Sequence, residues 1–308
     1  MTAIEVKNLT KKFRHFTAVK NLNFRVAENL VTGFLGPNGA GKTTTIRMLG
    51  GLSNPSSGEI KIADTPLRFG DSRPNSLFGY LPEQPSFYAW MSGVEYMQFA
   101  AEAFGMAKDI RAKKIKKLLD LVDLGAASRK RIGTYSNGMR QRLGIAQALV
   151  NDPKVLIMDE PVSALDPIGR REVLTIIEEL KKSMTIFLST HILSDVDRIC
   201  DNVIIIKEGE IIADASLSSL KENYAKPLLS VEFCSDPIRI IADLKKEAWV
   251  RKIEKTGNHL KIWPNDQDVV QTNIPLKFLL QQKIGILQYG LVLPETEDLF
   301  VDLIKEVK

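Results

Sequence analysis

The spacing of apolar and polar residues divides the chain into segments with a strand pattern and segments with a helix pattern. Residues 4–6 and 22–26 alternate between apolar and polar side chains, which predicts two antiparallel strands at the edge of a sheet. Three other short runs are mostly apolar, and such runs are typical of strands buried on both faces of a parallel sheet. These runs are residues 30–35, 155–158 and 185–190.

Helical spacing of apolar residues occurs between these predicted strands. From about residue 86 to residue 131 the spacing predicts a mostly helical insertion, and further helices are expected over residues 140–150 and 168–180. A hairpin over residues 203–213 is expected to close this part of the chain. Strands that alternate with helices predict an α/β fold with a parallel sheet. We assign this fold to residues 1–224, with a helical subdomain at about residues 86–149.

The pattern then restarts and predicts a second, smaller domain over residues 225–308. Its elements follow the order β-α-β-β-α-β, with a trailing helix over residues 296–305, which is the order of a ferredoxin-like α+β domain. Asn258, His259 and Trp263 could suggest contact with RNA. However, acidic and basic residues are equal in number here, and no aromatic–glycine signature is present. We therefore expect an accessory domain with a dimer contact or a regulatory role.

Composition predicts a soluble intracellular protein. No run approaches the ~18 apolar residues of a membrane helix, and charged residues near the start replace the apolar block of a signal peptide. Cys200 and Cys234 have neither metal-ligand spacing nor a CxxC arrangement. The net charge of +5 lies in the first 225 residues, partly on the predicted helix near Lys113 and Lys116. That basic face could approach anionic lipid or nucleic acid, or it is an ordinary solvated face.

A phosphate-binding loop is the clearest motif in the chain. The segment GPNGAGKT matches the pattern G-x-x-x-x-G-K-[ST], and it lies between a predicted buried strand and a predicted helix. Its glycines let successive N–H groups turn inward, and the helix directs its positive end to the same place. Lys42 is expected to bind the β- and γ-phosphates, and Thr43 to ligate Mg²⁺. The predicted nucleotide-binding residues of this segment are Gly36, Pro37, Asn38, Gly39, Ala40, Gly41, Lys42, Thr43 and Thr44.

Two carboxylates follow one of the predicted buried strands. Asp159 and Glu160 come directly after residues 155–158, at the strand end where ligands bind in open α/β sheets. Adjacent strand residues point to opposite sides, so Asp159 can hold Mg²⁺ through water while Glu160 polarises an attacking water. His191 ends another strand, where a histidine is usually structural but can instead donate a hydrogen bond to a γ-phosphate.

A second helix start has the features of an anion site. Ser136 and Gly138 lie just before the helix predicted over residues 140–150. Ser136 supplies a hydroxyl, Gly138 lets an anion approach the backbone closely, and the helix start has unpaired N–H groups. Capping of the helix by Ser136 explains the same residues. The residues alone leave both interpretations open.

In their order and spacing, these motifs resemble the ATP-binding subunit of an ABC transporter, over about residues 3–222. GPNGAGKT resembles the Walker A loop of that family, VLIMDE its Walker B strand, YSNGM its signature segment and SALD its D-loop, which contains Asp166. By the same resemblance Gln84 is the Q-loop glutamine, His191 the switch histidine and Phe13 the aromatic residue that stacks on adenine. The implied catalytic residues are Glu160, His191 and Gln84, and the implied metal ligands are Thr43, Gln84 and Asp159.

The resemblance implies a RecA-like P-loop ABC ATPase core that uses ATP and Mg²⁺. It also implies a head-to-tail dimer, with itself or a relative, in which Lys42, Asp159 and Glu160 of one chain face Ser136 and Gly138 of the other across ATP. Closure would exclude water and position the nucleophile. A separate transmembrane permease is implied as a further partner, with this chain at the cytoplasmic face of the cell membrane.

Departures from the family pattern indicate a subclass. Asn137 and Met139 stand where many members have Gly and Gln, Tyr135 replaces Leu, and Phe13 replaces the commoner Tyr. These variants resemble ABC-2-type exporters, including drug and antibiotic self-resistance systems, so export of a drug, antibiotic or lipid is expected. The motifs do not exclude an importer. The other alternative is an ABC ATPase that acts on nucleic acid or ribosomes. The chain has a single cassette, and only a short distance separates the Walker A loop from the signature segment. Both features argue against a nucleic-acid partner.

Overall fold

The computed structural model describes residues 1–68, 77–224, 227–270, 272–282 and 284–293. The chain divides into two compact units, Met1–Leu217 and Ser218–Lys308. Helix α7 (Leu217–Tyr224) begins at this division, whereas the sequence pattern places the boundary after it. Among the described residues, no helix combines the length and the apolar composition that crossing a membrane requires.

A six-stranded sheet, in the order β10-β9-β3-β8-β7-β6, forms the centre of the first unit. Every strand pair in it is parallel except β9–β10, which form the predicted hairpin. Strands β3, β7 and β8 are completely buried, which confirms what their apolar runs predict. The strands are β3 (Val31–Leu35), β6 (Phe78–Leu81), β7 (Val155–Met158), β8 (Thr185–Thr190), β9 (Asn202–Lys207) and β10 (Glu210–Ser216).

The N-terminal strands form a sheet of their own instead of extending the parallel one. This antiparallel sheet has the order β2-β1-β4-β5, with β1 (Thr2–Phe13), β2 (Phe16–Ala27), β4 (Ser57–Ile62) and β5 (Thr65–Pro66). Its apolar face packs in one core with helix α1 (Lys42–Leu49) and the parallel sheet. Aromatic stacking joins the two sheets. The ring of Phe24 on β2 stacks on the ring of Phe34 on β3, with 6.0 Å between the ring centroids, and on the ring of Phe187 on β8, with 5.8 Å between them.

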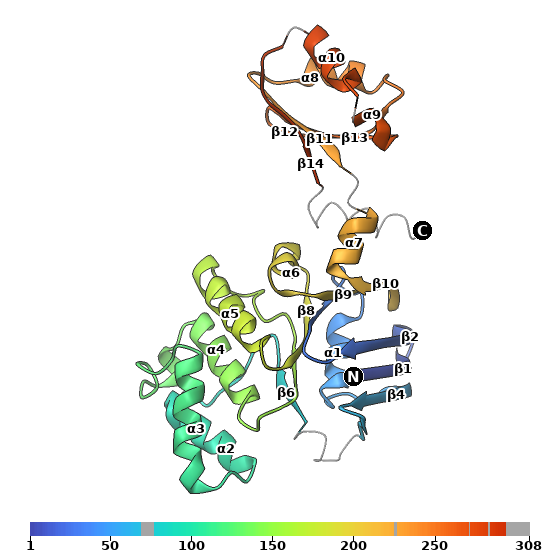
Figure 1. The fold of residues 1–308 in the computed structure, drawn as a ribbon. Coiled ribbons are helices and arrows are strands. Elements are labelled where there is room, and N and C mark those ends of the chain that lie inside the picture. Colours follow the sequence, from blue (N-terminus) through green and yellow to red (C-terminus); the bar gives the residue numbers. More distant parts are fainter. Residues whose placement is uncertain (69–76, 225–226, 271, 283, 294–308) are drawn as a thin grey trace. The chain divides into compact units, whose positions relative to one another are not determined.

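The helical insertion lies between β6 and β7, as predicted (Figure 1). Its first helix starts later than the periodicity indicates, because a capping box fixes the start of α2 at Ser92. The Ser92 side chain accepts a hydrogen bond from the Glu95 N–H, and the Glu95 carboxylate accepts one from the Ser92 N–H. The helices are α2 (Gly93–Ala103), α3 (Lys108–Leu121), the 3₁₀ turn Ile132–Thr134 and α4 (Asn137–Ala148), followed beyond β7 by α5 (Pro167–Leu180) and α6 (Leu193–Ile199).

The second unit contains an antiparallel sheet with the order β12-β13-β11-β14. Counted along the chain, this is the strand order 2-3-1-4, which is that of the predicted ferredoxin-like domain. The short helix α9 was not predicted, and the helix predicted over residues 296–305 lies outside the described residues. The elements are β11 (Leu228–Phe233), α8 (Ile238–Leu244), β12 (Val250–Thr256), β13 (His259–Pro264), α9 (Gln267–Val270), α10 (Ile274–Gln281) and β14 (Ile286–Val292).

Candidate functional site

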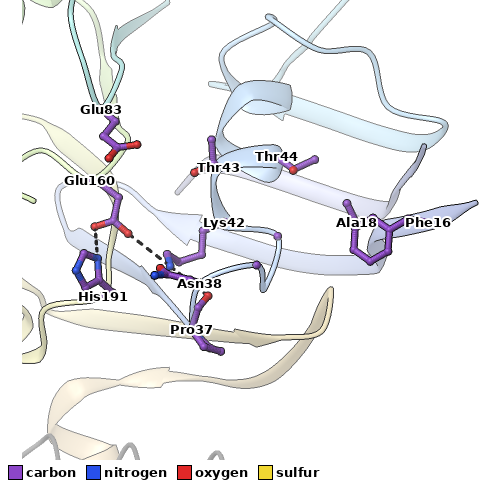
Figure 2. A pocket seen from close by; sticks show the side chains of 12 residues that line it. Phe16, Ala18, Pro37, Asn38, Lys42, Thr43, Thr44, Glu83, Glu160 and His191 are labelled. Atoms are coloured by element: carbon purple, nitrogen blue, oxygen red, sulfur yellow. Dashed lines mark hydrogen bonds and ion pairs between the residues drawn. The ribbon is translucent and has the colours of Figure 1, made fainter. Parts of the chain in front are cut away.

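A cavity of about 380 Å³ lies at the carboxyl edge of the parallel sheet (Figure 2). Four neighbouring strands deliver residues to it, since the phosphate loop follows β3, Glu83 follows β6, Glu160 follows β7 and His191 follows β8. This edge is where open α/β sheets bind ligands. The lining residues are Phe16, Ala18, Pro37, Asn38, Gly39, Gly41, Lys42, Thr43, Thr44, Glu83, Glu160 and His191.

Close backbone packing fixes the conformation of the phosphate loop. Gly41, the N-cap of α1, has a φ of +108°, and a Cβ there would lie 2.6 Å from the Ala18 carbonyl oxygen. A Cβ at Gly36 would lie 2.2 Å from the Ile206 carbonyl oxygen. Both positions therefore require glycine. The loop in turn holds the Lys42 ammonium, which donates to the Gly36 carbonyl oxygen at 2.8 Å.

Asp159 and Glu160 point to different partners, as adjacent strand-end residues should. The Asp159 carboxylate accepts a 2.7 Å hydrogen bond from the Ser189 hydroxyl and a 3.4 Å hydrogen bond from the Thr43 hydroxyl. Glu160 instead lies 3.4 Å from the Lys42 ammonium and 2.8 Å from His191 Nδ1. Figure 2 shows Glu160 and His191 on one side of Lys42, and Phe16 on the other.

Ser189 fixes the relative positions of the two carboxylates. Its hydroxyl accepts a 2.9 Å hydrogen bond from the Glu160 N–H while it donates to Asp159. The bond to the N–H supports an uncommon backbone conformation, because Glu160 has a φ of +46°. The sequence gives no direct signal for Ser189, which lies inside the predicted strand.

Burial is the largest influence on Asp159 and raises the pKa of its carboxyl. The hydrogen bonds from Ser189 and Thr43 oppose this effect, whereas the negative charges of Glu160 and Glu83 add to it. The protein therefore favours the ionised carboxylate less than water does. A divalent cation at this place would reverse that balance.

The donors around Asp159 fit Mg²⁺ chemistry. Mg²⁺ is usually held by one or two protein oxygens together with waters and substrate phosphates. The hydrogen-bonded pair of Thr43 and Asp159 supplies such oxygens beside the phosphate loop. Within the described part of the chain there is no group of three or more His, Cys, Asp and Glu side chains that could form an all-protein cage.

Glu83, and not the predicted Gln84, reaches the cavity. Gln84 instead lines a neighbouring cavity of about 330 Å³, together with Asn137 and Arg140 of α4 and Leu165, and Glu83 lines this cavity as well. A signal for Glu83 was available, because it is a carboxylate just beyond a buried strand, like Asp159.

Phe16 and Ala18 of β2 line the cavity, whereas the predicted Phe13 does not. Phe13 is the cross-strand partner of Phe16 in the β1–β2 ladder, so both rings project from the same face of the hairpin. Phe13 is thus adjacent to the lining. The period-two pattern of β2, with Phe16 and Ala18 on one face, was the available signal.

Ser136, Gly138 and Asp166 lie outside the cavity. Ser136 caps α4 by accepting from the Met139 N–H at 3.2 Å, and Asp166 caps α5 by accepting from the Gly169 N–H at 2.8 Å. The two helix starts are close together, since a Cβ at Gly138 would lie 3.5 Å from the Gly169 Cα. Ser136 is exposed. Within one chain, its hydroxyl serves as the cap of α4.

A phosphate loop, two strand-end carboxylates and a histidine on one parallel sheet define a P-loop nucleoside triphosphatase. Comparison with known proteins narrows this class. The family model described as "ABC transporter" matches residues 19–163. The chain belongs to the ABC transporter family, as its ATP-binding subunit, and is an ATPase.

Relatives with this assignment cover most or all of the chain. The ABC transporter ATP-binding protein YxlF of Bacillus subtilis is 50% identical over 220 residues, or 71% of this chain and 72% of YxlF. YhcH of the same organism is 34% identical over 312 residues, or 100% of this chain and 97% of YhcH. The bacitracin transport ATP-binding protein BcrA of Bacillus licheniformis is 40% identical over 229 residues, which is 74% of each chain.

Solved structures show the same fold. An ATP-binding subunit of an ABC transporter, at 31% identity, superposes with a TM-score of 0.65 over 72% of this chain and 93% of its own. CbiO1 of Clostridium perfringens, which is part of the ABC transporter complex CbiONQ, is 26% identical. It superposes with a TM-score of 0.65 over 80% of this chain and 99% of its own. These matches confirm the predicted family and cassette fold.

We expect Asp159→Asn to raise the melting temperature of the nucleotide-free protein at pH 8. Because the pKa of Asp159 is raised in the folded protein, the protonated carboxyl contributes stability that is fully present below the pKa of the unfolded chain. This contribution to the free energy of unfolding is lost as the pH rises through the folded-state pKa of Asp159. The neutral amide removes that loss, so the gain should shrink as the pH falls from 8 through the folded-state pKa of Asp159. Thermal unfolding at a series of falling pH values tests the prediction, with the exposed Asp109→Asn as control. A variant that is less stable than wild type at pH 8 would contradict it.

Proposed function

We propose that this chain is the ATP-hydrolysing subunit that powers export through a separate membrane permease. The observation that carries the proposal is the cavity in which the phosphate loop, Glu160 and His191 meet. The name of BcrA, a bacitracin transport protein, supports an antibiotic or other drug as the substrate for this chain as well.

Binding of ATP would replace contacts that the loop now makes with itself. The inward N–H groups of the loop and of the start of α1 would donate hydrogen bonds to the phosphate oxygens. Lys42 now bonds the Gly36 carbonyl and pairs with Glu160, and it would turn toward the β- and γ-phosphates. Release of this ion pair would leave Glu160 free to act on water. Nucleotide binding would thereby prepare the base.

Thr43 and Asp159 would hold Mg²⁺, which supplies charge neutralisation at the β- and γ-phosphates when it is bound. We propose Glu83 as the third protein group at this metal site, in preference to Gln84. Two observations support this choice: Glu83 lines the cavity, and its charge contributes to the raised pKa of Asp159.

Glu160 would accept the proton of the attacking water, and His191 would position the reacting groups. The 2.8 Å bond between Glu160 and His191 Nδ1 orients the imidazole. In the protonated form of the ring, Nδ1 donates to the Glu160 carboxylate and the other nitrogen can donate to a γ-phosphate. His191 is half-exposed while Glu160 is buried, so the ring lies at the mouth of the cavity. This position suits a group that senses whether the γ-phosphate is present.

A second chain, either an identical copy or a relative, would complete the site in a head-to-tail dimer. The open cavity and the exposed Ser136 support this arrangement. Ser136, Gly138 and Asp166 lie together at the starts of α4 and α5, outside the cavity of their own chain. They would cover the γ-phosphate of the ATP that is bound in the cavity of the other chain. This contact would exclude water from the site and stabilise the charge of the transition state.

The permease would dock on an exposed aromatic cluster, which we define as Tyr88, Trp90 and Phe99. The rings of Tyr88 and Trp90 are 6.0 Å apart, and those of Tyr88 and Phe99 are 5.8 Å apart. Trp90 is 68% exposed, which is unusual for an aromatic side chain and typical of an interaction surface. The cluster follows the segment with Glu83 and Gln84, so it could transmit nucleotide state to a membrane partner. The chain would then lie at the cytoplasmic face of the membrane.

We expect Glu160→Gln to retain ATP binding while lowering hydrolysis by about 10²-fold to 10⁴-fold, because the amide cannot accept the proton. Unhydrolysed ATP should trap a dimer. Single-turnover hydrolysis and sedimentation with ATP measure the two effects, with the exposed Glu59→Gln as control. Normal steady-state turnover by the variant in the presence of the permease would refute the role of Glu160.

A Mg²⁺ titration of ATP hydrolysis can decide whether Glu83 or Gln84 contributes to the metal site. Glu83→Ala should raise the Mg²⁺ concentration for half-maximal activity by about tenfold or more, since an acidic group near the cation is lost. Gln84→Ala should leave that concentration nearly unchanged. The reverse order of effects would restore the assignment of the metal to Gln84.

Trp90→Ala should abolish co-purification with the permease and the stimulation of hydrolysis that the permease causes. Its hydrolysis in the absence of the permease should stay unchanged, because the ring lies outside the cavity. Phe104→Ala is the matched control, as Phe104 is also exposed and aromatic but follows the other end of α2. Full retention of the permease by Trp90→Ala would exclude this docking surface.

A further inference from the structure

The two edges of the C-terminal sheet differ in how they are protected from pairing. In the order β12-β13-β11-β14, strands β12 and β14 are the edges within the described part of the chain (Figure 1). Strand β12 reads VRKIEKT and carries four charged residues, whereas β14 reads ILQYGLV and has neither a charge nor a proline. Charges, lysine above all, are the usual means by which an edge strand avoids pairing with another chain. Only β14 lacks that protection.

The apolar face of the sheet is also incomplete at β14. Leu291 is the cross-strand partner of Leu229, which is fully buried in the core, yet Leu291 itself is 50% exposed. Tyr289 packs at the margin of the same core, opposite the buried Val231. One more strand beside β14 would cover both side chains. The exposed face and the free backbone edge therefore coincide.

We propose that β14 pairs in antiparallel orientation with β14 of a second copy of this chain. An uncharged strand meets its own copy without like-charge repulsion, whereas β12 would bring Arg251, Lys252 and Lys255 against one another or against the single Glu254. Two identical strands related by a two-fold axis form a closed interface, which limits assembly to a dimer. The joined sheets would contain eight strands, twice the four of one unit.

The register of the pairing follows from an irregularity in the strand. The β11–β14 ladder shifts between Gln288 and Ile286, so the regular part of β14 extends from residue 288 to residue 292. The middle of that segment is Gly290. A two-fold axis at Gly290 places Tyr289 of each copy opposite Leu291 of the other. Aromatic–aliphatic pairs of this kind contribute about 0.2–1 kcal/mol each.

This contact differs from the ATP-dependent dimer proposed above because it needs no nucleotide. It would raise the effective concentration of one cassette around the other. Closure around ATP would then be an event within one assembly.

Gly290→Cys provides a direct test by self-crosslinking. No atom lies within 4 Å of a Cβ placed at Gly290, and its backbone is outside the left-handed region, so the side chain should be tolerated. Opposed residues of an antiparallel pair have Cα atoms about 4.5–5.5 Å apart, which a disulfide can span. The background is full-length Cys234→Ser, because Cys234 is exposed while Cys200 is buried.

The expected result is an oxidant-dependent covalent dimer without nucleotide, formed by Gly290→Cys and absent from the matched variant Glu254→Cys on β12. Crosslinking of both variants to the same extent, or of neither, would overturn the proposal. The second result would arise if a different partner covers the edge. Loss of ATP-induced dimers by other variants would leave this test unaffected.

Sedimentation of the nucleotide-free protein provides a second measurement. Leu291→Lys places a charge on the free edge and should raise the dimer dissociation constant by at least about tenfold. Leu280→Lys, an equally exposed leucine on α10, should leave it unchanged. A wild-type protein that is monomeric at tens of micromolar without nucleotide, or equal effects of the two lysines, would contradict the pairing.

Discussion

Buried charge at the carboxyl edge of the parallel sheet is the constraint on which the site depends. Lys42, Asp159 and Glu160 are all nearly excluded from water, and an isolated buried charge is strongly unfavourable. Each has a partner from a different part of the chain: a loop carbonyl and Glu160 for Lys42, and the Ser189 hydroxyl for Asp159. The site is therefore held together before a nucleotide arrives. The same contacts also restrain Lys42 and Glu160, whose ion pair would have to break before Glu160 could act on water.

The distribution of binding groups over the cassette explains why association and hydrolysis would be coupled. The cavity collects residues from four strand ends, whereas the starts of α4 and α5 lie outside it and satisfy their own caps. A single chain can thus hold phosphate on one side only. If a second chain supplies the other side, the γ-phosphate becomes the link between two subunits, and its removal becomes a mechanical signal for a permease.

The C-terminal unit extends this logic to a different kind of contact. Within the described residues, charged side chains protect the edge strand β12 of its sheet from pairing, whereas the other edge strand, β14, has no charge and carries exposed leucines. A permanent contact at one end of the chain and a nucleotide-dependent contact at the other would serve different purposes. The first would keep two subunits together, and the second would change their state during each cycle.

The sequence alone determined the features that depend on local pattern and spacing. Period-two and mostly apolar runs identified the strands. The phosphate loop identified the site, because a strand, a glycine-rich turn and a helix start must be contiguous in the chain. The order and spacing of all the motifs identified the family. The order of elements in the C-terminal unit likewise gave its ferredoxin-like topology. The helix over residues 296–305 stays a prediction.

Only the tertiary structure decided which side chains meet. It placed Glu83 instead of Gln84 in the cavity, added Phe16 and Ala18, and put Ser189 between the two carboxylates. It also separated the N-terminal strands into a second sheet and made β14 an edge. These outcomes depend on which distant strands pair and in what register, and a shift of one residue reverses the side on which every side chain of a strand lies.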